Sequence, residues 1–146
     1  MALGAILGAI LTACITGCGN ASHSSPLAAR SAAAESHLAA YAATVRYPAS
    51  VKPSTDLAAA ALINPKTDTV KVVNFSDQPM RDVDVWVNGA FVCRTDVIPS
   101  HGSVMVSRNE LFDATGKNMA RQDAHPKRVE VQMGEHLYAL GEARTD

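Results

Sequence analysis

Neither sign of charge is in excess in this chain of 146 residues. Lysine and arginine together number 13, aspartate and glutamate number 14, and the formal net charge at pH 7 is −1. Proteins that hold nucleic acid or an anionic membrane surface by electrostatics carry an excess of basic side chains. The composition therefore gives no electrostatic support for either partner, and we expect no nucleic-acid binding.

The chain also lacks a hydrophobic run long enough to cross a membrane. Residues 2–17 contain no charged side chain, but a transmembrane helix needs roughly 20 apolar residues. The length of this stretch is typical of the apolar part of a signal peptide. The alternative is a buried, alanine-rich helix of a cytosolic domain. Gly4, Gly8 and Gly17 disfavour it, because each glycine costs about 1 kcal/mol inside a helix.

Two cysteines follow short runs of aliphatic and small residues, Leu11-Thr12-Ala13-Cys14 and Ile15-Thr16-Gly17-Cys18. Both tetrapeptides resemble the processing site of bacterial lipoprotein precursors, although the expected basic residue after Met1 is absent. The resemblance implies that the cysteine is acylated and that the chain is cut just before it. We favour Cys18 over Cys14, because a cut before Cys14 leaves too short an apolar segment.

The resemblance also implies where the mature protein is located. Two or three acyl chains hold a protein stably on a membrane without any transmembrane helix. We therefore expect a membrane-anchored protein of the bacterial cell envelope. The outer membrane is favoured, because Gly19 is not the aspartate that retains lipoproteins of this family at the inner membrane.

Three cysteines are too few for a disulfide framework in this protein. If Cys14 leaves with the signal and Cys18 is acylated, Cys93 has no partner for an intramolecular disulfide. Cys93 lies in an apolar strand pattern, with no histidine or helix N-terminus near it in sequence to activate a thiolate. We expect a buried, unreactive thiol.

The pattern predicts a signal peptide over residues 1–17, a lipid-anchored flexible tether over 18–56 and a folded domain over 57–146. Residues 31–44 are rich in alanine and could form a marginal helix, because few large side chains are available for packing. Pro48 and Pro53 end that pattern. The tether is interpreted as a spacer that lifts the domain off the membrane, and unselected disorder is the alternative.

From residue 57 onward the pattern is typical of β-structure. Val83, Val85 and Val87 alternate with other side chains, which is the period of a strand with one buried face. Asn88-Gly89 is a strong hairpin signal, because both residues tolerate positive φ angles. The expected strands cover 57–63, 70–75, 83–87, 91–95, 103–106, 128–133 and 136–140.

One short helix is expected between the strand at 103–106 and the strand at 128–133. Ser107 and Glu110 have the spacing of a capping box, and Gly116 can end the helix in a left-handed conformation. About seven strands with frequent turns predict an all-β fold, a small antiparallel sandwich with one short helix.

Part of this domain carries a longer pattern, VVNFSDQPMRDVDVWVNGAFV followed by VIPSHGSVMVSRNELFDATGK. Over residues 70–118 the chain resembles a domain that recurs in small bacterial lipoproteins and secreted proteins. The resemblance implies an immunoglobulin-like β-sandwich of unknown function and supplies no catalytic residues. The Cys…Trp…Cys framework of antibody domains is absent.

Trp86 is the side chain that points most clearly to an interaction. If the three valines face the core, Trp86 faces the opposite way with Asp84 and Asn88, and we interpret these three residues as an interaction surface. The alternative is that the strand register is reversed, or that the tether or the short helix covers Trp86.

The candidates for catalysis or metal binding are weaker. His101, His125 and His136 could meet only through the fold, because no two histidines have helical metal-site spacing. Asp82 and Asp84 share a strand face, and the oxygen-rich residues 113–118 fit a helix-ending turn better than a calcium loop. No Gly-x-Ser-x-Gly nucleophile motif occurs. We therefore expect no metal, no cofactor and no catalytic residue.

The function expected from the sequence is that of a non-enzymatic binding or envelope-assembly module. Its partners would be the membrane, through the covalent lipid, and a protein of the cell envelope. One alternative is a small envelope enzyme or a metal-binding protein that uses histidine and aspartate side chains of the sandwich loops. A third interpretation is a structural spacer, for which Trp86 would be covered within the chain.

Overall fold

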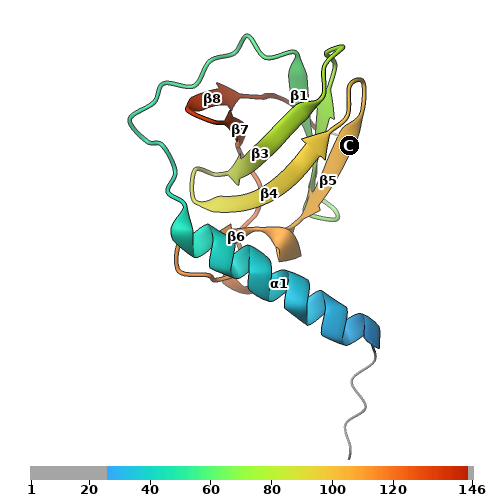
Figure 1. The fold of residues 1–146 in the computed structure, drawn as a ribbon, viewed down its shortest axis with the longest axis vertical. Helices are drawn as coiled ribbons and strands as arrows, with labels where there is room; N and C mark the ends of the chain where they lie inside the picture. The colour runs from blue at the N-terminus through green and yellow to red at the C-terminus, as the bar shows by residue number, and fades with distance from the viewer. Residues whose placement is uncertain (1–25, 145–146) are drawn as a thin grey trace, which may run out of the picture.

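The computed structural model describes residues 26–144, and Figure 1 shows two facing β-sheets with a single α-helix across one end. The predicted signal segment and both candidate acylation sites, Cys14 and Cys18, lie outside the described residues. The elements in chain order are α1 (Pro26–Thr44), β1 (Ala59–Asn64), β2 (Thr69–Asn74), β3 (Met80–Val87), β4 (Phe91–Ile98), β5 (Ser103–Ser107), the 3₁₀ turn η1 (Arg108–Glu110), β6 (Phe112–Asp113), the 3₁₀ turn η2 (Ala120–Gln122), β7 (Val129–Met133), β8 (His136–Ala139) and β9 (Gly141–Arg144).

The strands form a four-stranded sheet with the order β5-β2-β1-β9 and a five-stranded sheet with the order β6-β4-β3-β7-β8. All pairs within the sheets are antiparallel except β1 with β9, which run parallel. The predicted mainly β architecture is confirmed. The sequence did not indicate β6 or β9, because a two-residue strand shows no period and β9 follows β8 after a single residue.

The tight turns follow their sequence signals. Asn88 and Gly89 have φ angles of 57° and 66°, as a type I′ hairpin between β3 and β4 requires. The turn between β1 and β2 is closed by the side chain of Asn64, which accepts hydrogen bonds from the Lys66 and Thr67 N–H groups. Gly134, with a φ of 59°, turns the chain between β7 and β8. The hairpin predicted at Asn88-Gly89 is therefore present, and similar hairpins join β1 to β2 and β7 to β8.

The short helix is smaller than the sequence predicted. The Glu110 carboxylate accepts hydrogen bonds from the N–H and Oγ of Ser107, at 2.8 and 2.9 Å, which confirms the predicted pairing. The helical turn nevertheless ends at Glu110, and the next residues form β6. Gly116, with a φ of 75°, belongs to a separate turn, where its N–H donates to the Asp113 carbonyl. The expectation that Gly116 ends the helix was wrong, because Leu111 and Phe112 are buried in extended conformation.

A valine-rich core fills the space between the two sheets. Val83, Val85 and Val87 of β3 are fully buried and face Val70 and Val72 of the opposite sheet. Burial of each such side chain contributes roughly 1.5–3 kcal/mol to folding. Cys93 belongs to this core and forms no disulfide within the described part of the chain. Burial is the main reason that its pKa rises to about 12, and the thiol is therefore protonated at neutral pH.

A buried asparagine connects two loops at one end of the sandwich. Asn74 is fully buried, and its amide nitrogen donates to the carbonyls of Gln78 at 2.8 Å and Pro99 at 3.1 Å. Its side-chain oxygen accepts hydrogen bonds from the N–H and Oγ of Ser76. One amide thus replaces solvent for polar groups of the β2–β3 and β4–β5 connections, which would otherwise be buried at a cost.

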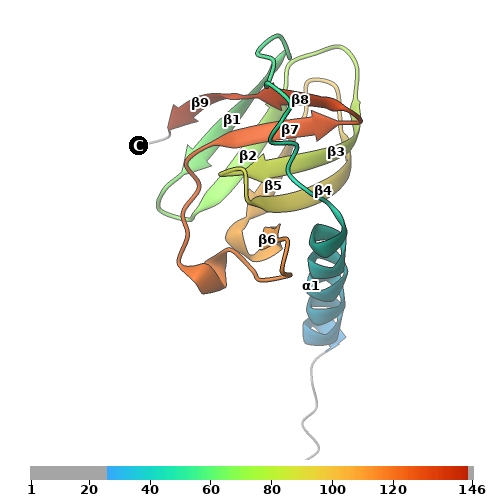
Figure 2. The same ribbon diagram turned by 90° about the vertical axis from the view of Figure 1, so that its left-hand side faces the viewer.

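The alanine-rich segment differs from the predicted flexible tether. Residues 26–44 form α1, and its second half packs on the five-stranded sheet through Leu38, Tyr41 and Ala42. Figure 2 shows the first turns of α1 extending beyond the sheets. Among the described elements, no helix has both the length and the apolar character needed to span a membrane. Packing of these few side chains stabilises a helix that would be marginal alone.

The chain between α1 and β1 follows the edge of the five-stranded sheet. The Ser54 N–H donates to the Leu137 carbonyl at 2.9 Å, and the Ser54 carbonyl accepts from the Ala139 N–H at 2.8 Å. Ser54 therefore adds a one-residue bridge to the outer edge of β8. Much of the segment predicted to be a tether is part of the folded unit.

We predict that Asn74→Ala lowers the free energy of unfolding by roughly 2–3 kcal/mol, because it leaves buried carbonyls without a donor. Urea denaturation followed by circular dichroism measures the change. Gln78→Ala is the matched control, since the Gln78 side chain is exposed and only its main chain takes part in this network. Equal effects from the two variants would contradict the assigned role of Asn74.

Candidate functional site

The candidate site lies on the outer face of the five-stranded sheet, around Trp86. The alternation along β3 places Trp86 and Asp84 on the face opposite the valine core, as the sequence predicted. Trp86 is nevertheless only 3% exposed. The Tyr47 ring meets it edge-on, with 5.4 Å between the ring centroids, and Ala42 of α1 packs against it. The indole N–H donates to the Gln132 side chain at 3.0 Å.

The interaction surface expected at Trp86, Asp84 and Asn88 is therefore not an open patch. The same chain covers Trp86 and Asp84, which is the alternative that the sequence left open. The physical reason is that Ala42, with a side chain of one methyl group, allows α1 to approach the indole closely. Asn88 lies apart from this layer, at the tip of the β3–β4 hairpin, where its amide bonds to the main chain at His125, Lys127 and Arg128.

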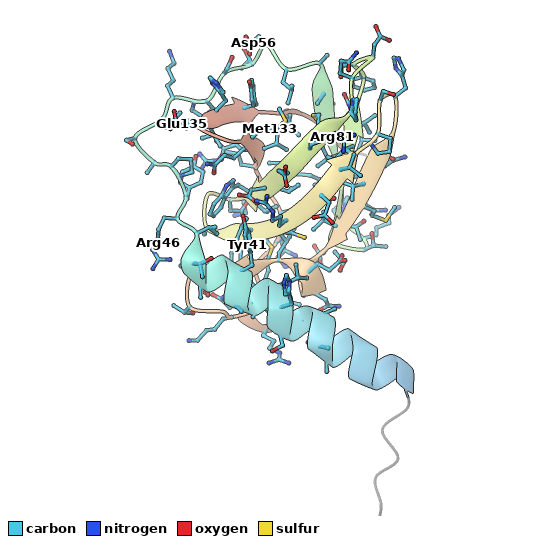
Figure 3. All side chains as sticks on the ribbon, viewed as in Figure 1. Tyr41, Arg46, Asp56, Arg81, Met133 and Glu135 are labelled. Carbon is cyan, nitrogen blue, oxygen red and sulfur yellow. The ribbon has the colours of Figure 1, made fainter. Side chains whose placement is uncertain are left out.

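A tyrosine from α1 binds the buried Asp84. The Tyr41 hydroxyl donates to the Asp84 carboxylate at 2.7 Å and accepts from the Arg94 guanidinium at 2.8 Å. Arg94 also pairs with Asp82 at 2.9 Å and lies 5.3 Å from the centre of the Tyr41 ring. Burial, together with the hydrogen bond to Asp84, raises the pKa of Tyr41. Figure 3 shows Tyr41 between α1 and the sheet. The hydrogen bonds and ion pairs of this network hold α1 on the sheet.

A second tyrosine covers a second buried carboxylate. Glu130 of β7 is 1% exposed, and the Tyr47 hydroxyl donates to both of its oxygens, at 3.1 and 3.0 Å. Arg128 pairs with Glu130 at 3.4 Å and lies over the Tyr47 ring. Burial and the hydrogen bond to Glu130 raise the pKa of Tyr47. Among the described residues, no buried side-chain nitrogen or oxygen lacks a partner.

Nothing in the expected site pointed to Tyr41, Tyr47 or Glu130. The strand pattern contained a signal for Glu130, because Val129 and Val131 are core positions and the residue between them must face away from the core. No comparable signal existed for the tyrosines, which precede the sheet by many residues and reach it only through the docking of α1.

A cavity of about 400 Å³ lies beside Trp86, between the end of α1, the β3–β4 hairpin and the loop after β6. Most of its lining is apolar and comes from Ala42, Val45, Trp86, Ala90, Val92 and Ala114. Polar groups stand with these residues, among them Arg46 and Asp113. Arg46 is exposed, and its guanidinium donates to the Ala43 and Val45 carbonyls at 3.1 and 2.9 Å, which holds its charge at the end of α1. Ligand pockets with a few polar groups typically have this size and composition.

The oxygen-rich loop beside the cavity uses its carboxylate internally. Burial alone would raise the pKa of Asp113, but hydrogen bonds from the Thr115 hydroxyl, the Lys117 N–H and the Gln122 side chain outweigh it and lower the pKa to about 2. The Asp113 side chain thus bonds within its own loop, and this loop follows strand β6. The expectation that these residues form a turn at the end of a helix was therefore wrong. Asp113 is an ionised, fully used acceptor at neutral pH.

The other candidate residues do not converge. His101 pairs with Asp77 at 2.8 Å, and His125 pairs with Asp68 at 2.8 Å, beside Arg108. These two pairs lie in different loops, away from the Asp82–Arg94–Asp84 contacts. The His136 ring lies beside the Tyr138 ring in a tilted arrangement, with 6.3 Å between ring centroids. In the part of the chain that the structure describes, no three metal-ligating side chains come together.

Comparison of the chain with protein-family models, with curated proteins and with solved structures finds no significant match. The case for a function therefore rests on the cavity beside Trp86 and on the sequence.

We predict that Ala42→Arg displaces α1 from the sheet, because a long charged side chain has no room against the indole. Trp86 is the only tryptophan, so its fluorescence reports the change directly. The emission should shift to longer wavelength, and acrylamide quenching should increase. Ala43→Arg is the matched control, since Ala43 is exposed. If both variants retain the native emission, Ala42 does not control docking.

Proposed function

We propose that this chain is an exported protein, anchored to an envelope membrane by acyl chains on Cys18, that works as a non-enzymatic binding module. The observation that carries the proposal is the apolar cavity beside Trp86. Its lining suits an apolar group, and Arg46 would meet an anionic substituent on that group. In the corresponding biological role, envelope assembly, a partner would insert such a group into the cavity.

The position of α1 supports anchoring close to the membrane. Residues 19–25 separate Cys18 from the start of α1 and span at most about 25 Å when fully extended. The 19 residues of α1 add about 28 Å at 1.5 Å per residue. Figure 1 shows the start of α1 clear of the sheets and its end against them. The helix would act as a stalk, with the cavity at the end remote from the membrane.

We further infer that the domain is a variant of the immunoglobulin-like sandwich that residues 70–118 resemble. Two facing sheets of mainly antiparallel strands, joined by tight turns, support this inference. The parallel pairing of β9 with β1 completes the four-stranded sheet.

Binding can be tested with 1-anilinonaphthalene-8-sulfonate, an apolar probe with one anionic group. We predict energy transfer from Trp86 to the bound probe at a stoichiometry of one. Ala114→Leu should weaken binding, because it fills the cavity, and Ala40→Leu, on an exposed position of α1, should leave binding unchanged. Absence of transfer in the native chain, or equal affinity in both variants, would contradict the assigned cavity.

The anchor is tested separately by metabolic labelling with radioactive palmitate. We predict that Cys18→Ala abolishes the label and accumulates an unprocessed precursor, because acylation precedes cleavage in the family that residues 15–18 resemble. Cys14→Ala should retain the label. A label lost in Cys14→Ala and kept in Cys18→Ala would move the anchor to Cys14, and an unlabelled native chain would refute lipidation.

A further inference from the structure

Strand β5 forms one end of the four-stranded sheet and pairs only with β2 among the described strands. Its sequence, Ser-Val-Met-Val-Ser, contains no charge and no proline. Proteins usually protect such an edge with charged side chains, proline or a covering segment, because unpaired main-chain groups recruit another strand. An uncharged edge strand of this length is therefore a candidate for pairing between molecules.

The edges of the other sheet are protected. Ser54 bridges the outer edge of β8, and β6 is only two residues long. At the other end of the four-stranded sheet, β9 runs parallel to β1 and ends the described chain. Figure 1 shows β5 at the margin of the domain. In the described chain, β5 combines an uncovered edge with apolar side chains.

The direction of the main-chain groups of β5 follows from its neighbours. The Ser107 N–H donates to Glu110 and the Gly102 carbonyl accepts from Asn74, so the even-numbered residues bond toward β2. Hydrogen-bonding direction alternates along an antiparallel strand. The N–H and carbonyl groups of Ser103 and Met105 therefore point away from the sheet. The Met105 side chain stands on the outer face and is 63% exposed.

The sequence of β5 reads the same in both directions about Met105. An antiparallel pair of two such strands, related by a two-fold axis at Met105, places serine against serine, valine against valine and methionine against methionine. An interface with two-fold symmetry brings the same patch of both subunits together and needs a self-complementary surface. We propose that β5 is a dimerisation edge, at which a second copy of this chain pairs antiparallel with the first.

In this arrangement the two Met105 residues exchange both of their main-chain hydrogen bonds. Each Ser103 N–H donates to the Ser107 carbonyl of the other copy. The Ser107 N–H stays bonded to Glu110, which limits the ladder at that point. The two four-stranded sheets become continuous, and both exposed Met105 side chains come to lie side by side on the outer face.

The pairing does not depend on the proposed function. A five-residue edge buries little area, so association in solution is weak, since stable interfaces bury about 1,200 Å² or more. Attachment to a common surface would raise the effective concentration of the two copies. Detergent-solubilised full chain at high concentration provides the corresponding condition in a measurement.

Cross-linking tests the register. Met105→Cys in the full chain should give covalent dimers with a short bismaleimide, because the two side chains lie side by side across the axis. Leu62→Cys is the matched control. Leu62 lies in the same row of the sheet, opposite Lys71, which is opposite Met105, but two strands from the edge. Each variant is compared with the unmodified chain, which contains the same other cysteines. Equal yields at the two positions, or no product at Met105, overturn the proposal.

Sedimentation of the full chain in detergent tests the state of association. The native chain should show twice the monomer mass at high protein concentration. Met105→Lys should be monomeric, because two ammonium groups would stand directly opposite each other, and Met105→Leu should remain dimeric. Met105 is exposed, and circular dichroism verifies that each variant is folded. A monomeric native chain, a dimeric Met105→Lys variant, or open-ended assemblies overturn the proposal.

Discussion

The outer face of the five-stranded sheet imposes the constraint on which the rest of the structure depends. Strands β3 and β7 contribute valines to the core, and their alternation sends Trp86, Asp84 and Glu130 to the opposite face. Exposure of an indole to water lowers the stability of the fold, and burial of a carboxylate is costly unless a partner neutralises its charge. The cover for this face must therefore be apolar for Trp86 and must supply donors for both carboxylates.

The segment before the sheets meets both requirements. Ala42 and Leu38 provide apolar contact, while Tyr41 and Tyr47 each combine a ring with a hydroxyl donor. Arg94 and Arg128 add a positive charge to each carboxylate and lie over the tyrosine rings. The segment from α1 to Tyr47 thus belongs energetically to the β domain. The cavity beside Trp86 lies where this cover meets the β3–β4 hairpin and the loop after β6.

The docking of α1 also links location with binding in the proposed function. A free tether would let the domain move independently of its anchor, whereas a docked helix sets the separation between membrane and cavity. The uncovered edge of β5 lies on the other sheet, so the proposed pairing of two copies and the proposed occupation of the cavity would use different surfaces of the same domain.

Local patterns in the sequence determined the strands other than β6 and β9, the hairpin at Asn88-Gly89, the capping pair Ser107–Glu110 and the buried state of Cys93, because each depends on a period of two or on a few neighbouring residues. The orientation of Trp86 was predictable for the same reason. Its burial was not, since it depends on Tyr41, Ala42 and Tyr47, which lie some forty residues earlier in the chain.

The alanine-rich composition of α1 shows that a helix can form but not where it packs. Only the tertiary structure decided that α1 covers the sheet, that the tyrosines bind Asp84 and Glu130, and that the palindromic strand β5 stands at an edge, because these are contacts between distant segments with no local signal.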